Sequence, residues 1–324
     1  MQRFSRRALL QCGGGALAVS LAGCLGDSSG EAGQSTATAS FFVLSDFAEQ
    51  IVGDGLTIEN LVPVGQHGHG WEPGPNVQRS VLQSLAFLYV GHGFQPWADN
   101  IVSNLAADAP EVVVVEAWED IDLLAATGHD QGEEDGGHKE DEDHDETGVD
   151  PHFWLNPQRA AQAVETIAAG LGAADADRAQ QYRDGAAAYT EVLSDLDTEF
   201  ENALSTRTRE AVLVAGHDAF QYLATRYGFE VHALSSLSPD DEPTPQDVRH
   251  AQEIIEEHDI EYVLAPVFES DRAARQLVEE TDATGLLPIT SIPSISEEWR
   301  DKGWSYEDIM REVNLASLTE ALGA

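Results

Sequence analysis

Residues 156–204 have a helical pattern almost throughout, and strand–helix alternation lies on both sides of this stretch. In the later part, 175–204, apolar residues recur three or four positions apart, which places them on one face of a helix. These residues are Tyr182, Ala186, Tyr189, Leu193, Leu196 and Phe200. A helix of about 30 residues is roughly 45 Å long, more than one small lobe needs. The sequence therefore predicts two lobes joined by a long, rigid helix.

Each lobe is predicted to be α/β, with a mostly parallel sheet flanked by helices, because short apolar segments alternate with helical patterns. In the first lobe we expect strands at 41–44, 57–62, 87–90 and 112–116, and helices at 46–52, 76–85 and 97–107. In the second lobe we expect strands at 211–215, 230–234 and 262–267, and helices at 219–227, 245–258, 271–280 and 306–322. The expected boundaries are 41–155 for the first lobe, 156–205 for the connecting helices and 206–324 for the second lobe. We expect each lobe to have its own core.

The first 24 residues predict an export signal. A basic start with the twin arginines Arg6 and Arg7 precedes a short apolar stretch, 8–22,. The ending Leu-Ala-Gly-Cys at Cys24 resembles a lipobox, in which this cysteine becomes the lipid-bearing N-terminus. The alternative is an uncleaved anchor, and both interpretations place the protein outside the cell, tethered to the membrane. Residues 25–40 then predict a flexible tether.

Cysteine content and charge exclude several kinds of site and partner. The two cysteines, Cys12 and Cys24, both lie in the signal, so that the mature chain has neither a disulfide nor a thiolate ligand. With 58 acidic and 17 basic residues, the net charge is -41. This charge would repel nucleic acid. It is typical of proteins from high-salt, halophilic environments, so the overall charge is not evidence for cation binding.

Residues 128–148 interrupt the alternation. Asp and Glu dominate this segment, which also contains His129, His138 and His144. It has no large apolar residue to bury and is predicted to be a mobile loop. One hypothesis is that the loop collects metal weakly and delivers it to a tighter site. The alternative is a solvated insertion without a function.

Three other histidines lie in contexts that indicate a shared site: His69, His152 and His217. His69 lies in a glycine-rich loop after a predicted strand, and His217 follows another, so both are expected at carboxyl edges of sheets, where α/β proteins bind ligands. His152 lies just before Asn156 and Pro157, which can cap and begin a helix. The alternative for each is a structural role, in a loop, at a helix cap or bonded to the backbone.

Imidazole ligands favour zinc and other late first-row metals, whereas carboxylate-rich sites suit manganese. The sequence has no His-Glu-x-x-His motif, EF-hand loop, P-loop or Gly-x-Ser-x-Gly elbow,. Three alternatives remain at this point. They are a zinc hydrolase with Asp218 as general base, a manganese or iron binder with a carboxylate ligand, and an adhesion protein with an incidental metal.

Over residues 40–322 the chain resembles the metal-specific (zinc/manganese) solute-binding proteins of ABC transporters. The stretch 65–73 is similar to the family's Gly-x-Asp-Pro-His-x-Tyr-Glu-Pro, with His69 at the ligand position. It departs from this pattern at His67, which replaces Asp, and at Gly68, which replaces Pro. Further similar segments are 91–97, 150–157, 216–220, 242–245 and 314–315.

The resemblance implies a monomeric binding protein, not an enzyme, that holds zinc between its lobes through His69, His152 and His217, with manganese as the alternative metal. It implies delivery of the metal to the permease subunits of an ABC transporter, at the extracellular face of the cytoplasmic membrane. Many family members have a fourth, acidic ligand, but the corresponding region, 287–293, contains no carboxylate. Glu269, Asp271 and Glu297 lie near it in the sequence without matching the position. The fourth position is left to water, to His67 or to another residue.

Overall fold

The computed structural model describes residues 35–66, 68, 71–126, 148–237 and 243–324, all within one compact unit, Gln34–Ala324. The predicted export signal with Cys24, His67, His69 and the loop up to residue 147 lie outside the described residues. Ala125 and Val149 pair as an antiparallel bridge on the two sides of this loop. No helix of the described ranges is long and apolar enough to cross a membrane.

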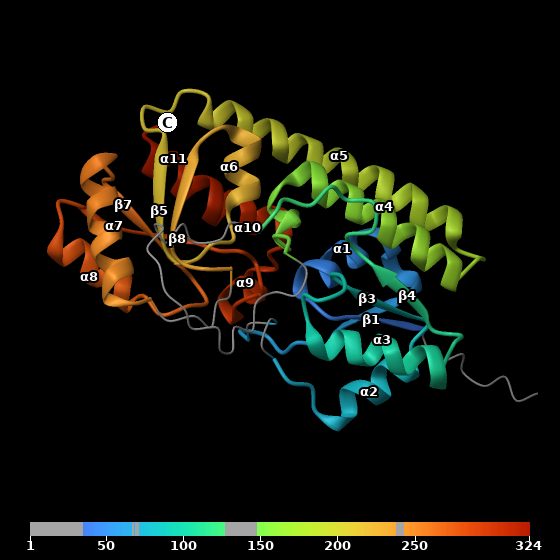
Figure 1. Ribbon diagram of the computed structural model, residues 1–324. Helices are drawn as coiled ribbons and strands as arrows, with labels where there is room; N and C mark the ends of the chain where they lie inside the picture. The colour runs from blue at the N-terminus through green and yellow to red at the C-terminus, as the bar shows by residue number, and fades with distance from the viewer. Residues whose placement is uncertain (1–34, 67, 69–70, 127–147, 238–242) are drawn as a thin grey trace, which may run out of the picture. The chain divides into compact units, whose positions relative to one another are not determined.

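The first sheet has four parallel strands in the order β2-β1-β3-β4 (Figure 1). Its strands are β1 (Thr36–Ala39), β2 (Thr57–Asn60), β3 (Ala86–Tyr89) and β4 (Val113–Glu116). Its helices are α1 (Phe42–Val52), α2 (Pro75–Leu82) and α3 (Pro96–Asp108). The prediction of a strand at 41–44 was wrong, because Phe41 is the N-cap of α1 and the next three residues begin this helix. The first strand lies inside the segment predicted as a tether: its alternating threonines and alanines lack the large apolar residues that mark a strand.

The second sheet repeats this topology in the order β6-β5-β7-β8, also fully parallel. Its strands are β5 (Ala211–His217), β6 (Glu230–Ser235), β7 (Tyr262–Pro266) and β8 (Gly285–Ile289). Its helices are α6 (Gln221–Tyr227), α7 (Pro245–Glu257), α8 (Arg272–Glu280), α9 (Glu297–Lys302), α10 (Tyr306–Ile309) and α11 (Ala316–Leu322), with a π-helical segment, Met310–Leu315, before α11. Two elements, β8 and α9, had no counterpart in the prediction. The α/β fold class with two parallel sheets is confirmed.

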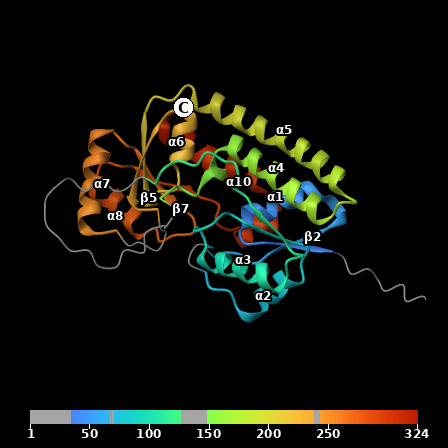
Figure 2. The ribbon, with the colours of Figure 1, turned by 45° about the vertical axis from the view of Figure 1, so that its right-hand side comes forward.

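Two helices connect the sheets: α4 (Pro157–Ala174) and α5 (Ala179–Leu204). Figures 1 and 2 show them side by side, with α5 extending from the first sheet to the second. The residues predicted to form one apolar face of α5 are all buried. This face packs on α1 at one end and on α6 and α11 at the other, so α5 is a common support for both lobes.

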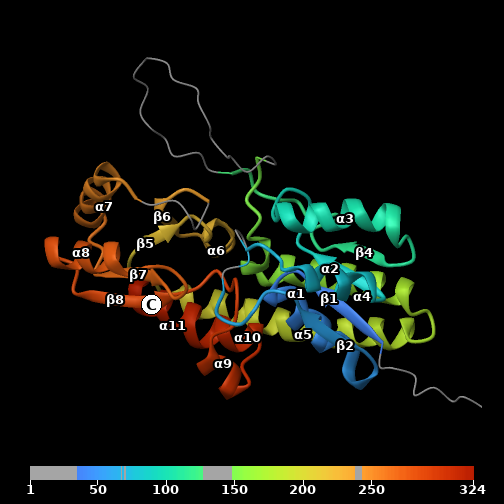
Figure 3. The same ribbon diagram turned by 90° about the horizontal axis from the view of Figure 1, so that it is seen from below.

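The cores follow from this arrangement. Separate apolar clusters lie beneath α2 and α3 and beneath α7 and α8, which cover the outer faces of the two sheets (Figure 3). The largest cluster is continuous and includes Phe47 of the first lobe, Leu193 of α5 and Met310 of the second lobe. The expectation of one core for each lobe was therefore incomplete, because the apolar face of α5 joins the inner faces of both lobes.

A buried carboxyl also links the lobes. An oxygen of Asp46, in α1, accepts a hydrogen bond of 3.1 Å from the backbone N–H of Tyr306, the first residue of α10. Burial raises the pKa of Asp46 to about 8, and the negative charges of Glu307, Glu49 and Asp308 act in the same direction, while the bond from Tyr306 opposes the shift. At neutral pH the folded state therefore favours the protonated form.

Asp46→Asn is predicted to remove a pH dependence of stability. A carboxyl whose pKa is raised in the folded state stabilises fully below its unfolded pKa, near 4, and loses this contribution as the pH rises toward 8,. Asparagine mimics the neutral carboxyl. The free energy of unfolding of the variant, relative to that of the wild type, should therefore rise by about 1 kcal/mol for each pH unit between 5 and 8. Urea unfolding at constant salt measures this difference. Asp54→Asn, an exposed change just beyond α1, is the control, and a pH-independent difference for Asp46→Asn would contradict the prediction.

Candidate metal centre

The local sequence fixes the backbone around His152. This residue precedes a short 3-10 turn, Phe153–Leu155, and Asn156 then caps α4. The Asn156 side chain accepts a 2.9 Å hydrogen bond from the N–H of Gln158, and Pro157 is the first helical residue. The predicted cap is confirmed. The His152 side chain is buried, with 1% of the residue exposed.

His217 is the last residue of β5, at the carboxyl edge of the second sheet, and it is fully buried. Its ring lies beside that of His152, with 5.2 Å between the ring centroids. The structure therefore brings together two of the three predicted site residues, from segments 65 residues apart (217 − 152). The third, His69, lies outside the described residues. Its described neighbour Gly68 accepts a 3.0 Å hydrogen bond from the side chain of Gln95.

Each of the two imidazoles has a carboxylate partner. An oxygen of Asp150 accepts hydrogen bonds from the backbone N–H of His152, at 2.9 Å, and from its Nδ1, at 2.8 Å. The Nδ1 of His217 donates to an oxygen of Glu269 at 2.6 Å. An imidazole that donates from Nδ1 to a carboxylate has its tautomer and orientation fixed, and Nε2 is then its ligand atom. Two such pairs side by side are typical of a metal-binding site.

The electrostatics of the site favour neutral imidazole. Burial, and then the charge of His217, hold the pKa of His152 well below its ordinary value. Burial raises the pKa of Asp150 to about 7, although the N–H of His152 and the charge of His217 oppose this shift. A neutral imidazole is the form that binds metal, so His152 needs to lose no proton when a cation enters at neutral pH.

Two features bring Glu269 to His217: the order of the strands in the second sheet, and the absence of a side chain at Gly216. Strand β7 pairs directly with β5, although β6 and α7 separate them in the sequence. The loop after β7 therefore lies beside the end of β5. A Cβ at Gly216 would lie 2.5 Å from a Glu269 oxygen, so a larger residue there would displace the carboxylate. The sequence offered Glu269 only as a possible direct metal ligand, and it assigned no role to Asp150. In the structure each of them instead contacts the Nδ1 of a histidine.

The segment 287–293, which corresponds to the family's acidic ligand position, is held in place by buried hydrogen bonds. The indole N–H of Trp154 donates to the Ser291 carbonyl at 2.8 Å. The Asn314 side chain binds both the N–H and the carbonyl of Thr290, each at 2.9 Å. Thr290 and Ser291 line a small pocket together with Glu269. The carboxylate of Glu269, which contacts the Nδ1 of His217, therefore borders this segment.

Glu269→Gln is predicted to weaken zinc binding roughly tenfold, at the lower end of the range for outer partners of metal ligands. Glutamine keeps the shape and can still accept from His217, but it removes the negative charge that makes the imidazole a better donor. Competitive titration against a zinc chelator measures the change. Glu280→Gln, on the surface of α8, is the matched control. If the wild type and Glu269→Gln bind zinc with equal affinity, Glu269 does not contribute to metal binding.

Most of the chain resembles known zinc-uptake proteins. A family model described as zinc-uptake complex component A periplasmic (ZnuA) matches residues 38–321. The zinc-binding lipoprotein AdcA of Streptococcus pneumoniae (strain ATCC BAA-255 / R6) is 30% identical over 288 residues, which are 89% of this chain and 56% of AdcA. The high-affinity zinc uptake system protein ZnuA of Bacillus subtilis (strain 168) is 27% identical over 282 residues, 87% of this chain and 86% of that protein.

Solved structures show the same architecture. The crystal structure of the Zn(II)-bound ZnuA-like domain of Streptococcus pneumoniae AdcA superimposes with a TM-score of 0.73 at 27% identity. The match covers 90% of this chain and 100% of that domain. The metal-dependent lipoprotein YcdH from Bacillus subtilis gives a TM-score of 0.73 at 26% identity, with the same coverage of both chains. The chain thus spans about half the length of the AdcA relatives that it matches, the half that forms the ZnuA-like domain.

Proposed function

The chain belongs to the family of zinc-uptake complex component A periplasmic (ZnuA), and from this membership we propose that it captures zinc outside the cell and delivers it to the permease of an ABC transporter. The family consists of solute-binding proteins of transporters, which are not enzymes. The hydrolase alternative with Asp218 as general base is therefore set aside. In the described structure an Asp218 oxygen accepts a hydrogen bond from the side chain of Gln221, at 2.8 Å.

The main support for the proposal is the buried pair His152–His217, in which the Nδ1 of each ring is hydrogen-bonded to a carboxylate. Two imidazoles supply two of the four positions of a tetrahedral zinc site. We assign the third to His69, on the evidence of its sequence motif. The fourth position is left to water, His67 or another residue, as the sequence indicated. A site with three protein ligands and one open position exchanges its metal more readily than a closed structural site.

Zinc is favoured over manganese and iron by the role of the carboxylates. A carboxylate ligand would favour the harder metals. Both carboxylates of the described site contact imidazole nitrogens instead, so they act as outer partners of the histidines. The zinc-binding relatives AdcA and ZnuA support the same assignment.

Location and partners complete the proposal. We assign lipid attachment to Cys24 and export to the twin-arginine signal, and relatives named as lipoproteins support the anchor. With β1 included, residues 36–155 would form one metal-binding lobe and 206–324 the other, joined by 156–205. A monomer would present the rims of both lobes to the permease. The continuous core around α5 limits how far the lobes can move apart.

Equilibrium dialysis with mixed metals tests the choice of metal. The purified protein is dialysed against equal concentrations of zinc and manganese, and the bound metals are quantified by mass spectrometry. The proposal predicts one tightly held zinc per chain and little bound manganese. Preferential retention of manganese would assign the protein to the alternative function, uptake of manganese by the same fold.

A further inference from the structure

A second group of metal-ligand side chains lies in the second lobe, outside the candidate metal centre. Glu230, His232 and His258 place one ligand atom each within 4.8 Å of one another. The rings of His232 and His258 are 5.0 Å apart between centroids. The Nε2 of His232 lies 3.8 Å from a Glu230 oxygen. Both histidines are half-buried, and Glu230 is exposed.

The strand register separates this group from the candidate metal centre. Glu230 begins β6 and pairs with Ala211, at the start of β5. His217 ends β5 and pairs with Ser235, and His232 pairs with Leu213. Leu213 and His217 are four positions apart, and at a rise of about 3.3 Å per residue this separation puts the two groups about 13 Å apart along the strands. The second group therefore lies at the amino edge of the sheet, opposite the edge that carries His217.

The fold explains why the three side chains meet. Glu230 and His232 are two residues apart in β6, so they point to the same face of the sheet. Leu234 continues this face and belongs to the core beneath α7. Helix α7 packs on β6 and ends at Glu257. The backbone N–H of His258 then donates a 3.0 Å hydrogen bond to the Ile254 carbonyl. A cation at this point would also meet the favourable, negative end of the helix dipole.

We propose that Glu230, His232 and His258 form a second, weaker site for a divalent transition metal, with zinc as the ion that fits best. Two imidazoles and one carboxylate are a ligand set used for zinc where a further position stays open to water. In a tetrahedral set with bonds of about 2.1 Å, ligand atoms lie about 3.4 Å apart, so the three side chains need only small rotations to bind one ion.

The surroundings of His232 support this assignment. Its Nε2 is shielded from solvent and has no hydrogen-bond partner among the residues that the structure describes. A buried polar atom without a partner costs free energy, which a bound cation would offset. The half-exposed site should bind more weakly than the buried pair His152–His217.

Zinc binding to the full-length purified protein tests the second site. The test variant is His232→Ala/His258→Ala, and the control is His250→Ala, which removes an exposed imidazole of α7 outside the group. Equilibrium dialysis should show one zinc fewer per chain in the test variant than in the wild type and the control. The tightest zinc should be unchanged in all three. Equal zinc content in the wild type and the test variant would overturn the proposal.

Two further experiments separate the second site from the candidate metal centre and from effects of the substitutions on folding. In a His152→Ala/His217→Ala background, the weak zinc should persist and should vanish only when His232 and His258 are also replaced. Acylation of histidines by diethyl pyrocarbonate, read by mass spectrometry, should show that zinc protects His258 in the wild type but leaves His250 reactive. This footprint needs no variant. Labelling of His258 that does not respond to zinc would contradict the second site even if a variant failed to fold.

Discussion

His152→Ala is expected to lower the affinity for zinc about a thousandfold, which corresponds to roughly 4 kcal/mol of binding free energy. Structural zinc sites bind with roughly 10–16 kcal/mol, so each of three protein ligands accounts for about this amount. The loss should exceed the roughly tenfold effect of Glu269→Gln, because His152 is assigned to the metal itself, whereas Glu269 acts through His217. Competitive titration with chelators of graded affinity measures both variants on one scale.

The control for this prediction is His92→Ala, which removes a histidine whose side chain is 78% exposed. It should bind zinc like the wild type. His217→Ala is a second test with the same expected loss, in case the buried substitution at His152 disturbs the fold. Thermal unfolding without zinc shows whether each variant is folded. Retention of wild-type affinity by folded His152→Ala and His217→Ala would show that the metal binds elsewhere.

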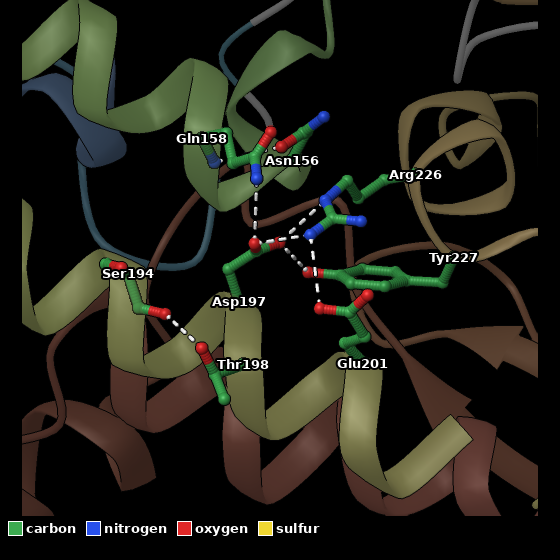
Figure 4. A network of polar contacts seen from close by, with 8 residues as sticks. All are labelled: Asn156, Gln158, Ser194, Asp197, Thr198, Glu201, Arg226 and Tyr227. Atoms are coloured by element: carbon green, nitrogen blue, oxygen red, sulfur yellow. Dashed lines mark hydrogen bonds and ion pairs between the residues drawn. The ribbon is translucent and has the colours of Figure 1, made fainter. Parts of the chain in front are cut away.

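Asp197→Ala is expected to destabilise the protein by about 3 kcal/mol. Asp197, in α5, is only 6% exposed and binds residues of two other helices (Figure 4). One of its oxygens accepts from the Arg226 Nε and the Tyr227 hydroxyl, each at 2.9 Å. The other accepts from the Arg226 Nη2 at 2.6 Å and from the Gln158 side chain at 2.9 Å. Removing one partner of a buried ion pair costs roughly 3–5 kcal/mol. Glu201 lies 3.6 Å from Arg226, so the arginine keeps one carboxylate nearby in the variant. We therefore expect a destabilisation at the lower end of this range.

Urea unfolding at neutral pH measures this destabilisation. Asp195→Ala is the matched control, since it removes an exposed carboxylate two residues away in the same helix. Asp197→Asn should fall between the two, because the amide keeps hydrogen bonds but loses the ion pair with Arg226. A change below about 1 kcal/mol for Asp197→Ala would mean that the network does not join α5 to α4 and α6 as described.

Much of the fold could be predicted because local signals and tertiary structure agree. Thr244 and Pro245 mark the start of α7 in the sequence, and in the structure the Thr244 side chain caps this helix. The two missed strands show where local signals are weak. The Thr-Ala-Thr-Ala segment of β1 has no large apolar residue, and β8 contains Pro288. Both become strands because neighbouring strands provide backbone partners, which local composition does not reveal.

The site was predictable where its residues lie in short motifs and not where they meet through strand order. The motifs indicated His152 and His217 separately, and the structure places their rings together. The role of Glu269 depends on the pairing of β7 with β5, which follows from the topology of the sheet and not from any local pattern. The same reason applies to Glu230, His232 and His258, because the return of α7 along β6 brings His258 to the start of the strand.

The most direct test of the central claim is a crystal structure of the zinc-loaded protein with anomalous diffraction recorded at the zinc edge. We expect a strong anomalous peak about 2.1 Å from the Nε2 atoms of His152 and His217, with His69 as a third ligand. Asp150 and Glu269 should remain on the Nδ1 atoms of the two rings. A zinc-loaded crystal whose strongest anomalous peak lies away from His152 and His217 would contradict the account.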